Sequence, residues 1–422
     1  MKKVKIKDIG EIITGKTPSS KNPEDFGYET MFITPRDIGS NKYVTKTERY
    51  LSKSGVIKLK SKLLPPNSII VSCIGSDMGK VVMNNDYAIT NQQLNSIIVN
   101  KGNYNCDYIY YVLKNSYKVL RQLASGSTAL PLINKNDFSE IELNIADLKV
   151  QNNIAKILSN IDSKIENNNK ILDELEILAK IIYDFWFLQF EFPNKEGKPY
   201  RSAGGQMKWN EELKREIPEG WVFEVLDKNV ETIIDHRGKT PAKLGGDWIE
   251  KGIIALSAKV VKNGKLINLE EANQVSRNMY EKWMPVKLRD GDILMTSEAP
   301  LGEFYYLLGE TEYCLSQRLY AIRANKNKIK PCYLYYELSK GNGLSQIMGS
   351  QSGSTVFGIR QDELRKIKIL RPNIEIQSHF ENTINPMLLK IKKTEIENRE
   401  LVQLRDWLLP MLMNGQVGFK KR

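Results

Sequence analysis

The fold of this chain is decided in residues 151–186, which read QNNIAKILSNIDSKIENNNKILDELEILAKIIYDFW. Two series of mainly apolar residues, each with a spacing of seven, interleave through this stretch. The first series is Ile154, Ile161, Asn168, Leu175 and Ile182, and the second is Leu158, Ile165, Leu172, Ala179 and Trp186. Five unbroken heptads are typical of a coiled-coil helix rather than of an ordinary amphipathic helix.

The same heptad pattern returns 226 residues later, in a stretch that begins near Gln377. Its two series are Phe380, Met387, Thr394, Leu401 and Leu408, and Ile384, Ile391, Asn398, Arg405 and Leu412. Pro386 and Pro410 lie within it, and because an interior proline removes a helical hydrogen bond, we expect a kink or a late start there. The residues expected to pair the two helices are Ile154, Leu158, Ile161, Ile165, Asn168, Leu172, Leu175, Ile384, Ile391, Thr394, Asn398 and Leu401.

Both heptad seams turn polar in the middle, at Asn168 in the first and at Thr394 and Asn398 in the second. If the helices pair antiparallel, their middles meet, and these side chains can share one hydrogen-bonded layer. Such a layer fixes the register of a coiled coil at some cost in stability. The alternative is that the three side chains face solvent where the seam loosens.

Each heptad helix follows a globular half, and the two halves share short strings in the same order. Gly-Lys-Thr-Pro occurs at 15–18 and 238–241, and Ser-Gly-Ser-Thr at 125–128 and 352–355. Between them, a tyrosine-rich run at 108–113 answers one at 333–338. Two copies are too few for a solenoid, so the repeat predicts one pseudo-symmetric molecule built like a fused dimer.

Within each half, short apolar runs alternate with polar turns, which predicts α+β halves with a mixed, mostly antiparallel sheet. The tyrosine-rich stretches 108–123 and 333–348 are each expected to form one amphipathic helix. The expected boundaries are 1–148 for the first half, 149–190 for the first heptad helix, 191–220 for a turn-rich linker, 221–373 for the second half and 374–415 for the second heptad helix.

The chain is basic, with a formal net charge of +12. Residues 1–150 contribute +7 and residues 221–371 contribute +5, so the excess lies mainly in the two halves. A basic surface of this kind attracts a polyanion such as nucleic acid, although a generally lysine-rich composition is an equal alternative.

Cysteine usage and hydropathy point to a reducing, aqueous compartment. Cys73, Cys106, Cys314 and Cys332 form no CxxC pair, which predicts free thiols. The sequence contains no apolar stretch near the roughly 20 residues of a membrane helix, and no signal peptide is recognisable. We therefore expect a cytoplasmic protein.

The sequence offers little that could carry catalysis. Residues 10–17 satisfy the phosphate-loop pattern GxxxxGK[ST] literally, but Ile12 and Ile13 look strand-like and the second copy lacks the first glycine. Neither His236 nor His379 has a counterpart in the other copy, which excludes most histidine-dependent metal or triad chemistry. We expect no catalytic residue, no metal site and no cofactor in this chain.

What remains suits recognition, because each half holds polar residues able to reach bases or phosphates. Arginine and lysine read guanine, glutamine reads adenine, and hydroxyls contact phosphates. The candidates are Lys16, Thr17, Thr34, Arg36, Ser72, Gln92, Ser125, Ser127 and Thr128 in the first half, and Arg237, Lys239, Thr240, Lys259, Thr296, Ser297, Gln317, Ser352, Ser354, Thr355 and Arg360 in the second. Each residue alone is common as a solvated turn residue, so their recurrence in matched places is the stronger signal.

Over essentially its whole length, the order of half, heptad helix, half, heptad helix resembles the specificity subunit of type I restriction–modification enzymes. Local strings agree: Gly-Lys-Thr-Pro near the start of each half, Ser-Gly-Ser-Thr followed by Ile-Arg-Gln-Asp at 359–362, and Pro372 shortly before Gln377. The first copy departs from the pattern, since Leu-Ile-Asn-Lys occupies 132–135. A base contact assigned to Arg360 therefore has no counterpart at Asn134.

The resemblance implies a non-catalytic DNA reader. Each half would be a target recognition domain for one part of a bipartite, asymmetric site. The helices would form an antiparallel coiled-coil spacer on which two methyltransferase subunits dock, with restriction/translocase subunits added for cleavage. S-adenosylmethionine, ATP and Mg²⁺ would belong to those partners.

Two other classes of function remain as alternatives. One is a self-contained restriction or modification enzyme, which would need methyltransferase or nuclease motifs. The other is a coiled-coil adaptor without a role on DNA, whose affinity for DNA would not depend on salt.

Overall fold

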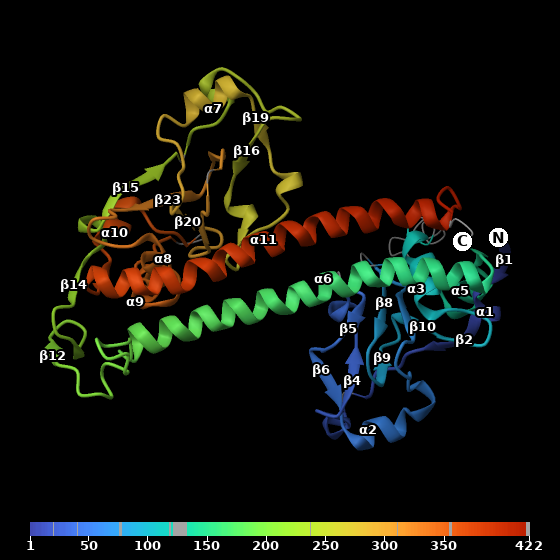
Figure 1. The fold of residues 1–422 in the computed structure, drawn as a ribbon. Coiled ribbons are helices and arrows are strands. Elements are labelled where there is room, and N and C mark those ends of the chain that lie inside the picture. Colours follow the sequence, from blue (N-terminus) through green and yellow to red (C-terminus); the bar gives the residue numbers. More distant parts are fainter. Residues whose placement is uncertain are drawn as a thin grey trace. The chain divides into compact units, whose positions relative to one another are not determined.

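The computed structural model describes residues 1–19, 21–39, 41–75, 78–117, 120, 133–236, 238–309, 311–353 and 357–418. The chain divides into two compact units, one made of Met1–Lys170 with Ile396–Arg422 and the other of Ile171–Glu395. Each unit contains one globular half and a part of both long helices, α6 (Leu148–Tyr183) and α11 (Ile374–Met413), which Figure 1 shows in green and red.

The first unit holds two main sheets. One has the strand order β2 (Gly10–Thr14), β10 (Leu94–Val99), β7 (Ile69–Ser72), β8 (Val81–Asn84), β5 (Tyr43–Val44), and the other β3 (Phe26–Gly27), β6 (Arg49–Leu51), β4 (Thr30–Ile33), β9 (Ala88–Thr90). The ladders β4–β9 and β5–β8 are parallel and the others antiparallel, as for β1 (Lys2–Lys5) with β11 (Glu142–Ile145). The short helices are α1 (Ile6–Ile9), α2 (Lys53–Lys58), α3 (Cys106–Asn115) and α5 (Lys135–Glu140).

The second unit repeats this plan with a sheet ordered β15 (Val230–Asp235), β23 (Leu319–Ala324), β20 (Ile293–Thr296), β21 (Phe304–Tyr306). A second sheet joins β19 (Gln274–Val275), β16 (Ile253–Leu256) and β22 (Cys314–Leu315), of which β16 and β22 are parallel. Two-stranded ladders join β14 (Val222–Val225) to β24 (Lys368–Arg371), β12 (Met207–Asn210) to β13 (Arg215–Pro218), and β17 (Val261–Lys262) to β18 (Lys265–Leu266). The helices are α7 (Arg277–Trp283), α8 (Pro331–Lys340), α9 (Asn342–Gly349) and α10 (Gln361–Lys366). The expectation of mixed, mostly antiparallel sheet is confirmed.

The start of each long helix is anchored by the same pair of hydrogen bonds. The Gln151 side chain accepts the backbone N–H of Asn105 (2.9 Å), and the Gln377 side chain accepts that of Lys330 (2.7 Å). Each side-chain amide nitrogen also donates to the carbonyl five residues earlier, at 2.9 and 2.7 Å. The predicted pseudo-symmetry therefore extends to individual hydrogen bonds.

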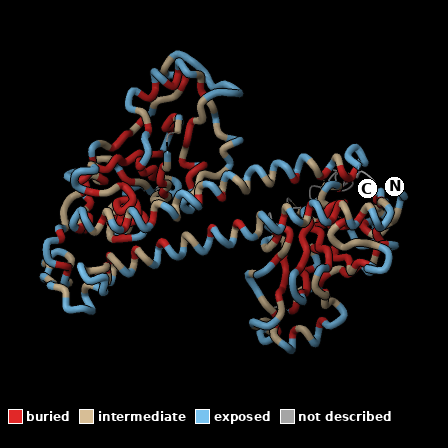
Figure 2. The backbone as a smooth tube through the Cα atoms, in the orientation of Figure 1, coloured by how far each residue is buried: buried red, intermediate tan, exposed pale blue. Residues whose placement is uncertain are grey.

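The heptad positions of α6 and α11 are buried or half-buried throughout, and Figure 2 shows buried positions recurring along both helices. In the first unit the helices run antiparallel, since Asp162 pairs with Arg405 (2.9 Å) while Asn168, later in α6, contacts Asn398, earlier in α11 (2.9 Å). In the second unit the Tyr183 ring lies 6.1 Å from the Phe380 ring. The predicted antiparallel coiled coil is confirmed.

The polar layer predicted for the middle of the seam forms within the first unit. Asn168 is 2% exposed, and its Nδ2 donates to Asn398 (2.9 Å) and Glu397 (3.0 Å). The Nδ2 of Asn398 in turn donates to Asn169 (2.8 Å). The solvent-facing alternative is thereby excluded for Asn168. Thr394 is buried as well, but its hydroxyl has no hydrogen-bond partner among the described residues.

One alternative for α11 and one expectation for the tyrosine-rich stretches are wrong. α11 runs unbroken from Ile374 to Met413, which excludes a late start at Pro386, whereas the kink stays a prediction. A proline removes one backbone donor, and the buried seam residues Ile384 and Ile391 on either side hold the helix in place. The tyrosine-rich stretch 333–348 forms two helices, α8 and α9, because the backbone of Gly341 is extended between them. The end of its counterpart, 108–123, lies outside the described residues beyond 117 except for residue 120.

Among the described residues, every helix is too short or too polar to span a lipid bilayer. The four cysteines are free thiols, as predicted, and burial raises the pKa of Cys73 to about 11 and that of Cys314 to about 12. A thiol with so high a pKa stays protonated and unreactive at neutral pH.

Candidate nucleic-acid interface

In the first unit, three turns that carry predicted contact residues meet at one edge of the sheets. Lys16 and Thr17 follow β2, Arg36 follows β4, and Gln92 lies between β9 and β10. The strands bring these turns together because β4 and β9 are parallel and β2 pairs with β10. The N–H of Lys16 donates to the Thr90 carbonyl (2.9 Å), and the Thr17 hydroxyl donates to Gln92 Oε1 (2.6 Å). We call Lys16, Thr17, Arg36 and Gln92 the first polar edge.

Gly15 is required at this edge by the close approach of the turns. A Cβ atom at Gly15 would lie 2.1 Å from the Thr90 carbonyl oxygen and 2.3 Å from the Asn91 carbonyl oxygen. No side chain fits against backbone at that distance. The repeated Gly-Lys-Thr-Pro string is therefore explained, for the first copy, by packing of one turn on another and not by phosphate binding. In agreement with this, residues 10–14 of the phosphate-loop match form strand β2.

The second unit builds an equivalent edge in which the lysine, threonine and glutamine recur and Lys259 replaces Arg36. Lys239 and Thr240 follow β15, Lys259 follows β16, and Gln317 lies between β22 and β23. The backbone bonds correspond closely in the two units. The N–H of Asn91 donates to the carbonyl of Ile33 (3.0 Å), as that of Ser316 does to Leu256 (2.8 Å). The N–H of Cys73 donates to the carbonyl of Gln93 (3.1 Å), as that of Ser297 does to Arg318 (2.8 Å). The N–H of Ile133 donates to the carbonyl of Cys73 (3.0 Å), as that of Ile359 does to Ser297 (3.0 Å).

Ser352 and Arg360 complete this second polar edge. Ser352 and Gly358 exchange backbone hydrogen bonds of 2.9 and 3.1 Å, and Arg360 is exposed at the start of α10. The counterpart of Arg360 in the first unit is Asn134, whose side chain caps a helix. Its Oδ1 accepts the N–H of Asp137 (2.9 Å) at the start of α5. We define the second polar edge as Lys239, Thr240, Lys259, Gln317, Ser352 and Arg360.

Some predicted contacts do not lie at either surface. Ser72, Thr296 and Ser297 are at most 1% exposed, so their hydroxyls are under the surface and cannot reach DNA, which corrects the prediction for these three. Thr34 is 8% exposed, and its hydroxyl donates to Asp37 (2.8 Å) to close a turn. Ser125, Ser127, Thr128, Arg237, Ser354 and Thr355 lie outside the described residues.

The charge at the two edges comes from lysine and arginine. Lys16, Arg36, Lys259 and Arg360 are exposed, so their long side chains can reach phosphate oxygens. His236 adds no charge at neutral pH, because burial and the nearby Lys239 lower the pKa of its imidazole. Among the described residues, no group of three or more His, Cys, Asp and Glu is arranged to hold a metal ion.

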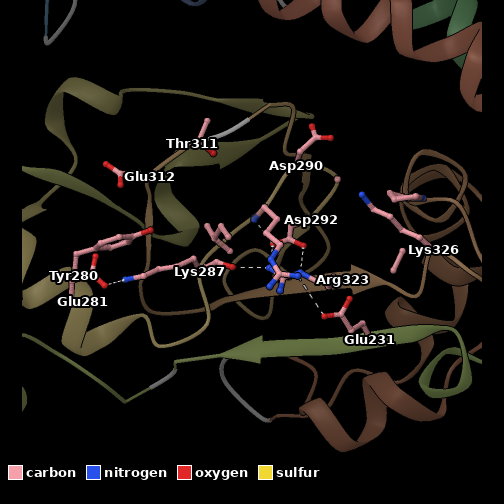
Figure 3. Close-up of a pocket in the computed structure, with 15 residues that line it drawn as sticks. Glu231, Tyr280, Glu281, Lys287, Asp290, Asp292, Thr311, Glu312, Arg323 and Lys326 are labelled. Carbon is pink, nitrogen blue, oxygen red and sulfur yellow. Dashed lines mark hydrogen bonds and ion pairs between the residues drawn. The ribbon is translucent and has the colours of Figure 1, made fainter.

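A cavity of about 700 Å³ lies in the second unit at the opposite end of sheet β15–β23–β20 from the second polar edge (Figure 3). At its base the Arg323 guanidinium donates to both carboxylate oxygens of Asp292, at 2.7 and 2.8 Å. Lys287 pairs with Glu281 at 2.6 Å. Five carboxylates and four cations line the cavity, so it has no excess of positive charge to attract a polyanion. The two polar edges are the better candidates.

One further residue at each edge could not be identified from the recurrence of like residues. Gln93 and Arg318 directly follow Gln92 and Gln317, and their carbonyls accept the equivalent backbone bonds described above. Both belonged to aligned strings, 87–94 and 312–319, but they differ in type, and recurrence of like residues was the signal in use.

Comparisons with known proteins point to one family over most of the chain. The family described as type I restriction modification DNA specificity domain matches residues 1–177 and 218–404. The specificity subunit of the type I restriction enzyme MjaIX of Methanocaldococcus jannaschii is 26% identical over 425 residues, which cover 98% of this chain and 92% of that protein. The HindI specificity subunit of Haemophilus influenzae is 40% identical over 140 residues, covering 33% and 30% of the two chains. The crystal structure of the type I S subunit from M. genitalium has a TM-score of 0.61 at 15% identity and covers 97% of this chain and 95% of that one, so the two share a fold.

Proposed function

Because this chain belongs to the type I restriction–modification DNA specificity family, we propose that it reads a bipartite, asymmetric DNA site with one half-site for each globular half. Specificity subunits are the non-catalytic, DNA-recognising members of these enzymes, which sets aside a self-contained enzyme. Residues 1–148 and 221–373 would be the two reading halves. The observation that carries the proposal is the pair of polar edges, which share backbone hydrogen bonds and a recurring lysine, threonine and glutamine, but differ where Lys259 replaces Arg36 and Arg360 replaces Asn134. Equivalent frames that differ at such positions are suited to reading two different sequences.

Salt dependence of DNA binding tests the proposal against the adaptor alternative. Phosphate contacts release counterions, so the affinity of the full chain for a duplex carrying its site should fall steeply between about 50 and 200 mM salt. Lys16→Ala and Lys259→Ala should each reduce the slope of log K against log salt by about one. Lys208→Ala, an exposed lysine in β12, is the matched control and should leave the slope unchanged. An affinity that stays flat across the series would exclude the DNA-reading function.

We further propose that two copies of a methyltransferase subunit dock on the long helices. Support comes from two exposed apolar pairs at positions 226 residues apart. Leu178 and Ile181 of α6 are 43% and 56% exposed, and Leu404 and Trp407 of α11 are 44% and 57% exposed. Large apolar side chains left in water at matched places are typical of an interaction site. A patch present once in each repeat suits a partner present in two copies.

Charge substitutions in these pairs test the docking. The double variants Leu178→Asp/Ile181→Asp and Leu404→Asp/Trp407→Asp should each remove one methyltransferase subunit from the complex, as measured by native mass spectrometry. Ile57→Asp, at a 73% exposed position of α2, serves as the control and should retain both subunits. Retention of both subunits by both double variants would refute this docking surface while leaving DNA reading untouched.

Restriction/translocase subunits would join the same complex, in the cytoplasm where its DNA lies. S-adenosylmethionine, ATP and Mg²⁺ would then bind to the partner subunits and not to this chain. Equilibrium dialysis of the purified chain with S-adenosylmethionine checks this assignment. Stoichiometric binding to the isolated chain would contradict it.

A further inference from the structure

Arg318 and Gln93 occupy the same backbone position in the two halves. Each lies directly before the strand at the centre of the half, β23 or β10, and directly after the glutamine of the polar edge. The carbonyl of Gln93 accepts the N–H of Cys73 (3.1 Å), and that of Arg318 accepts the N–H of Ser297 (2.8 Å). The backbone hydrogen bond is thus common to both halves, while the side chain differs and the left-handed backbone conformation occurs at Arg318 and not at Gln93.

The backbone of Arg318 has a left-handed conformation, with φ of +64°. Side chains other than those of glycine and asparagine are disfavoured there, and such residues persist mainly at binding and functional sites. Glycine would satisfy the backbone of this turn with less strain. An arginine in this conformation is therefore a reason to ask what its side chain contacts.

The Arg318 guanidinium is held at the surface by Glu298. Its Nε lies 3.1 Å from Glu298 Oε1, and about half of its side chain remains exposed. Among the described residues, Glu298 is the one acidic side chain within 4.0 Å of this guanidinium. Glu298 is itself fixed, because its backbone bridges to Gly358, which also pairs with Ser352. A guanidinium oriented through Nε presents its paired terminal N–H groups, which match the O6 and N7 acceptors of guanine.

Gln93 offers the other pattern at the equivalent place. Its backbone N–H donates to Asn91 Oδ1 (3.1 Å), and its Oε1 accepts from Asn91 Nδ2 (3.0 Å), so Asn91 holds both its backbone and its side chain. An oriented carboxamide both donates and accepts, which matches N7 and the N6 amino group of adenine.

We propose that Arg318 reads a guanine in the second half-site and that Gln93 reads an adenine at the equivalent position of the first. Glu298 is a positioning residue that aims the guanidinium. This inference rests on the proposed function, since it needs each half to read its own half-site. It goes further by naming one specificity-determining residue for each half and the base that it selects.

Methylation mapping with the complex of this chain and its methyltransferase tests the proposal on DNA randomised in both half-sites. Arg318→Gln should weaken the preference for guanine at one position of the second half-site by about tenfold to a hundredfold and leave the first half-site unchanged. Gln93→Arg should alter one position of the first half-site alone. Arg289→Gln, an exposed arginine beside the cavity, is the control and should keep the complete site.

Two further variants separate base reading from other roles. Arg318→Lys keeps the charge but replaces the planar fork with a single ammonium group, so it should weaken the preference for guanine less than Arg318→Gln does while retaining affinity for DNA. Glu298→Gln should broaden that position only. If Arg318→Gln instead weakens binding to every sequence equally and leaves the preferred base unchanged, Arg318 contacts phosphate and the proposal is wrong. An unaltered site in Arg318→Gln would also overturn it, whereas a wild-type complex with no bipartite site would refute the proposed function itself.

Discussion

Glu337 is a carboxyl group buried in the core of the second unit. It is 1% exposed, its Oε2 accepts from the Tyr183 hydroxyl (2.6 Å), and its Oε1 accepts from the backbone of Leu370 (3.2 Å). Burial raises the pKa of Glu337 from 4.5 to about 7, because these hydrogen bonds offset only part of the desolvation. The Glu337 carboxyl therefore links the end of α6 and strand β24 to its own helix, α8. The strength of this link depends on whether the carboxyl is protonated.

Replacement of this carboxyl should change how the second unit responds to pH. Between pH 4.5 and 7 the folded state keeps a proton that the unfolded state has lost, so wild-type stability falls as pH rises through this window. Each rise of one pH unit within the window should lower the free energy of unfolding by on the order of 1.4 kcal/mol. Glu337→Gln carries no charge and should flatten the dependence.

Urea denaturation at pH 5 and pH 8, followed by tryptophan fluorescence, measures this effect. Trp186, Trp209, Trp221, Trp248 and Trp283 all belong to the second unit, so the signal reports mainly on it. Glu216→Gln, at an exposed position, should behave like wild type. A Glu337→Gln variant with the wild-type pH slope would show that this carboxyl is not the source.

The buried Arg323–Asp292 pair should contribute to stability and not to sequence reading. Arg323→Met leaves the Asp292 carboxylate buried and unpaired, which is expected to cost about 3–5 kcal/mol. Because the pair lies at the sheet end away from the second polar edge, the methylated sequence should not change. Denaturation and methylation mapping together check both statements, and Arg323→Met/Asp292→Asn should recover part of the lost stability. A changed half-site would contradict the separation of these two ends.

For individual residues, the sequence predicted the position along the strand better than the exposure of the side chain. Recurrence of hydroxyl residues placed Ser72 and Thr296 at equivalent strand ends, which the structure confirms. Both strands are buried along their whole length, so they lack the polar alternation that would have revealed which side chains reach the surface. Glu337 was visible as the partner of Val112 in the tyrosine-rich runs, but its hydrogen bond to Tyr183 joins residues 154 positions apart.

At the scale of elements, the polar layer of the coiled coil should show strong coupling between its members. Asn168→Leu removes the partner of a half-buried Asn398 and should cost about 1–3 kcal/mol, the penalty for leaving a polar group unsatisfied. Asn168→Leu/Asn398→Leu replaces both groups with apolar ones and should recover that loss or exceed it. Chemical denaturation followed by helical circular dichroism gives the double-mutant cycle. Strictly additive effects would mean that the two amides stabilise the seam independently.

The elements that were predicted well are those with a local, repeated signal. A period of seven residues identified the seam of α6 and α11 because burial follows that period directly. The break between α8 and α9 has a tertiary cause instead. A Cβ atom at Gly341 would lie 2.1 Å from the Tyr183 hydroxyl, so the chain must bend there to admit a side chain from α6. The residues next to Gly341 in the sequence do not reveal this contact with Tyr183.

At the scale of the molecule, duplication was the most informative signal, because it separated what the frame requires from what each half presents. The matched anchors at Gln151 and Gln377 belong to the frame. The differences, such as Asn134 against Arg360 and Gln93 against Arg318, fall at the polar edges. The division of the chain into two units that share both long helices could not be predicted, since it depends on packing between segments more than 200 residues apart.

Independent reading by the two halves can be tested by exchanging one of them. A chimera that carries residues 221–371 from another specificity subunit, with both long helices kept, should recognise one new half-site and retain the other. The reason is that all residues of the second polar edge lie within that segment, whereas those of the first polar edge lie within residues 1–148. Methylation mapping of the chimera with its methyltransferase reads both half-sites in one measurement. The reciprocal exchange of residues 1–148 is the matched control and should alter the opposite half-site. If either exchange changed both half-sites, the halves would be coupled readers, and the assignment of one base to Arg318 and another to Gln93 would have to be tested in the context of the whole site.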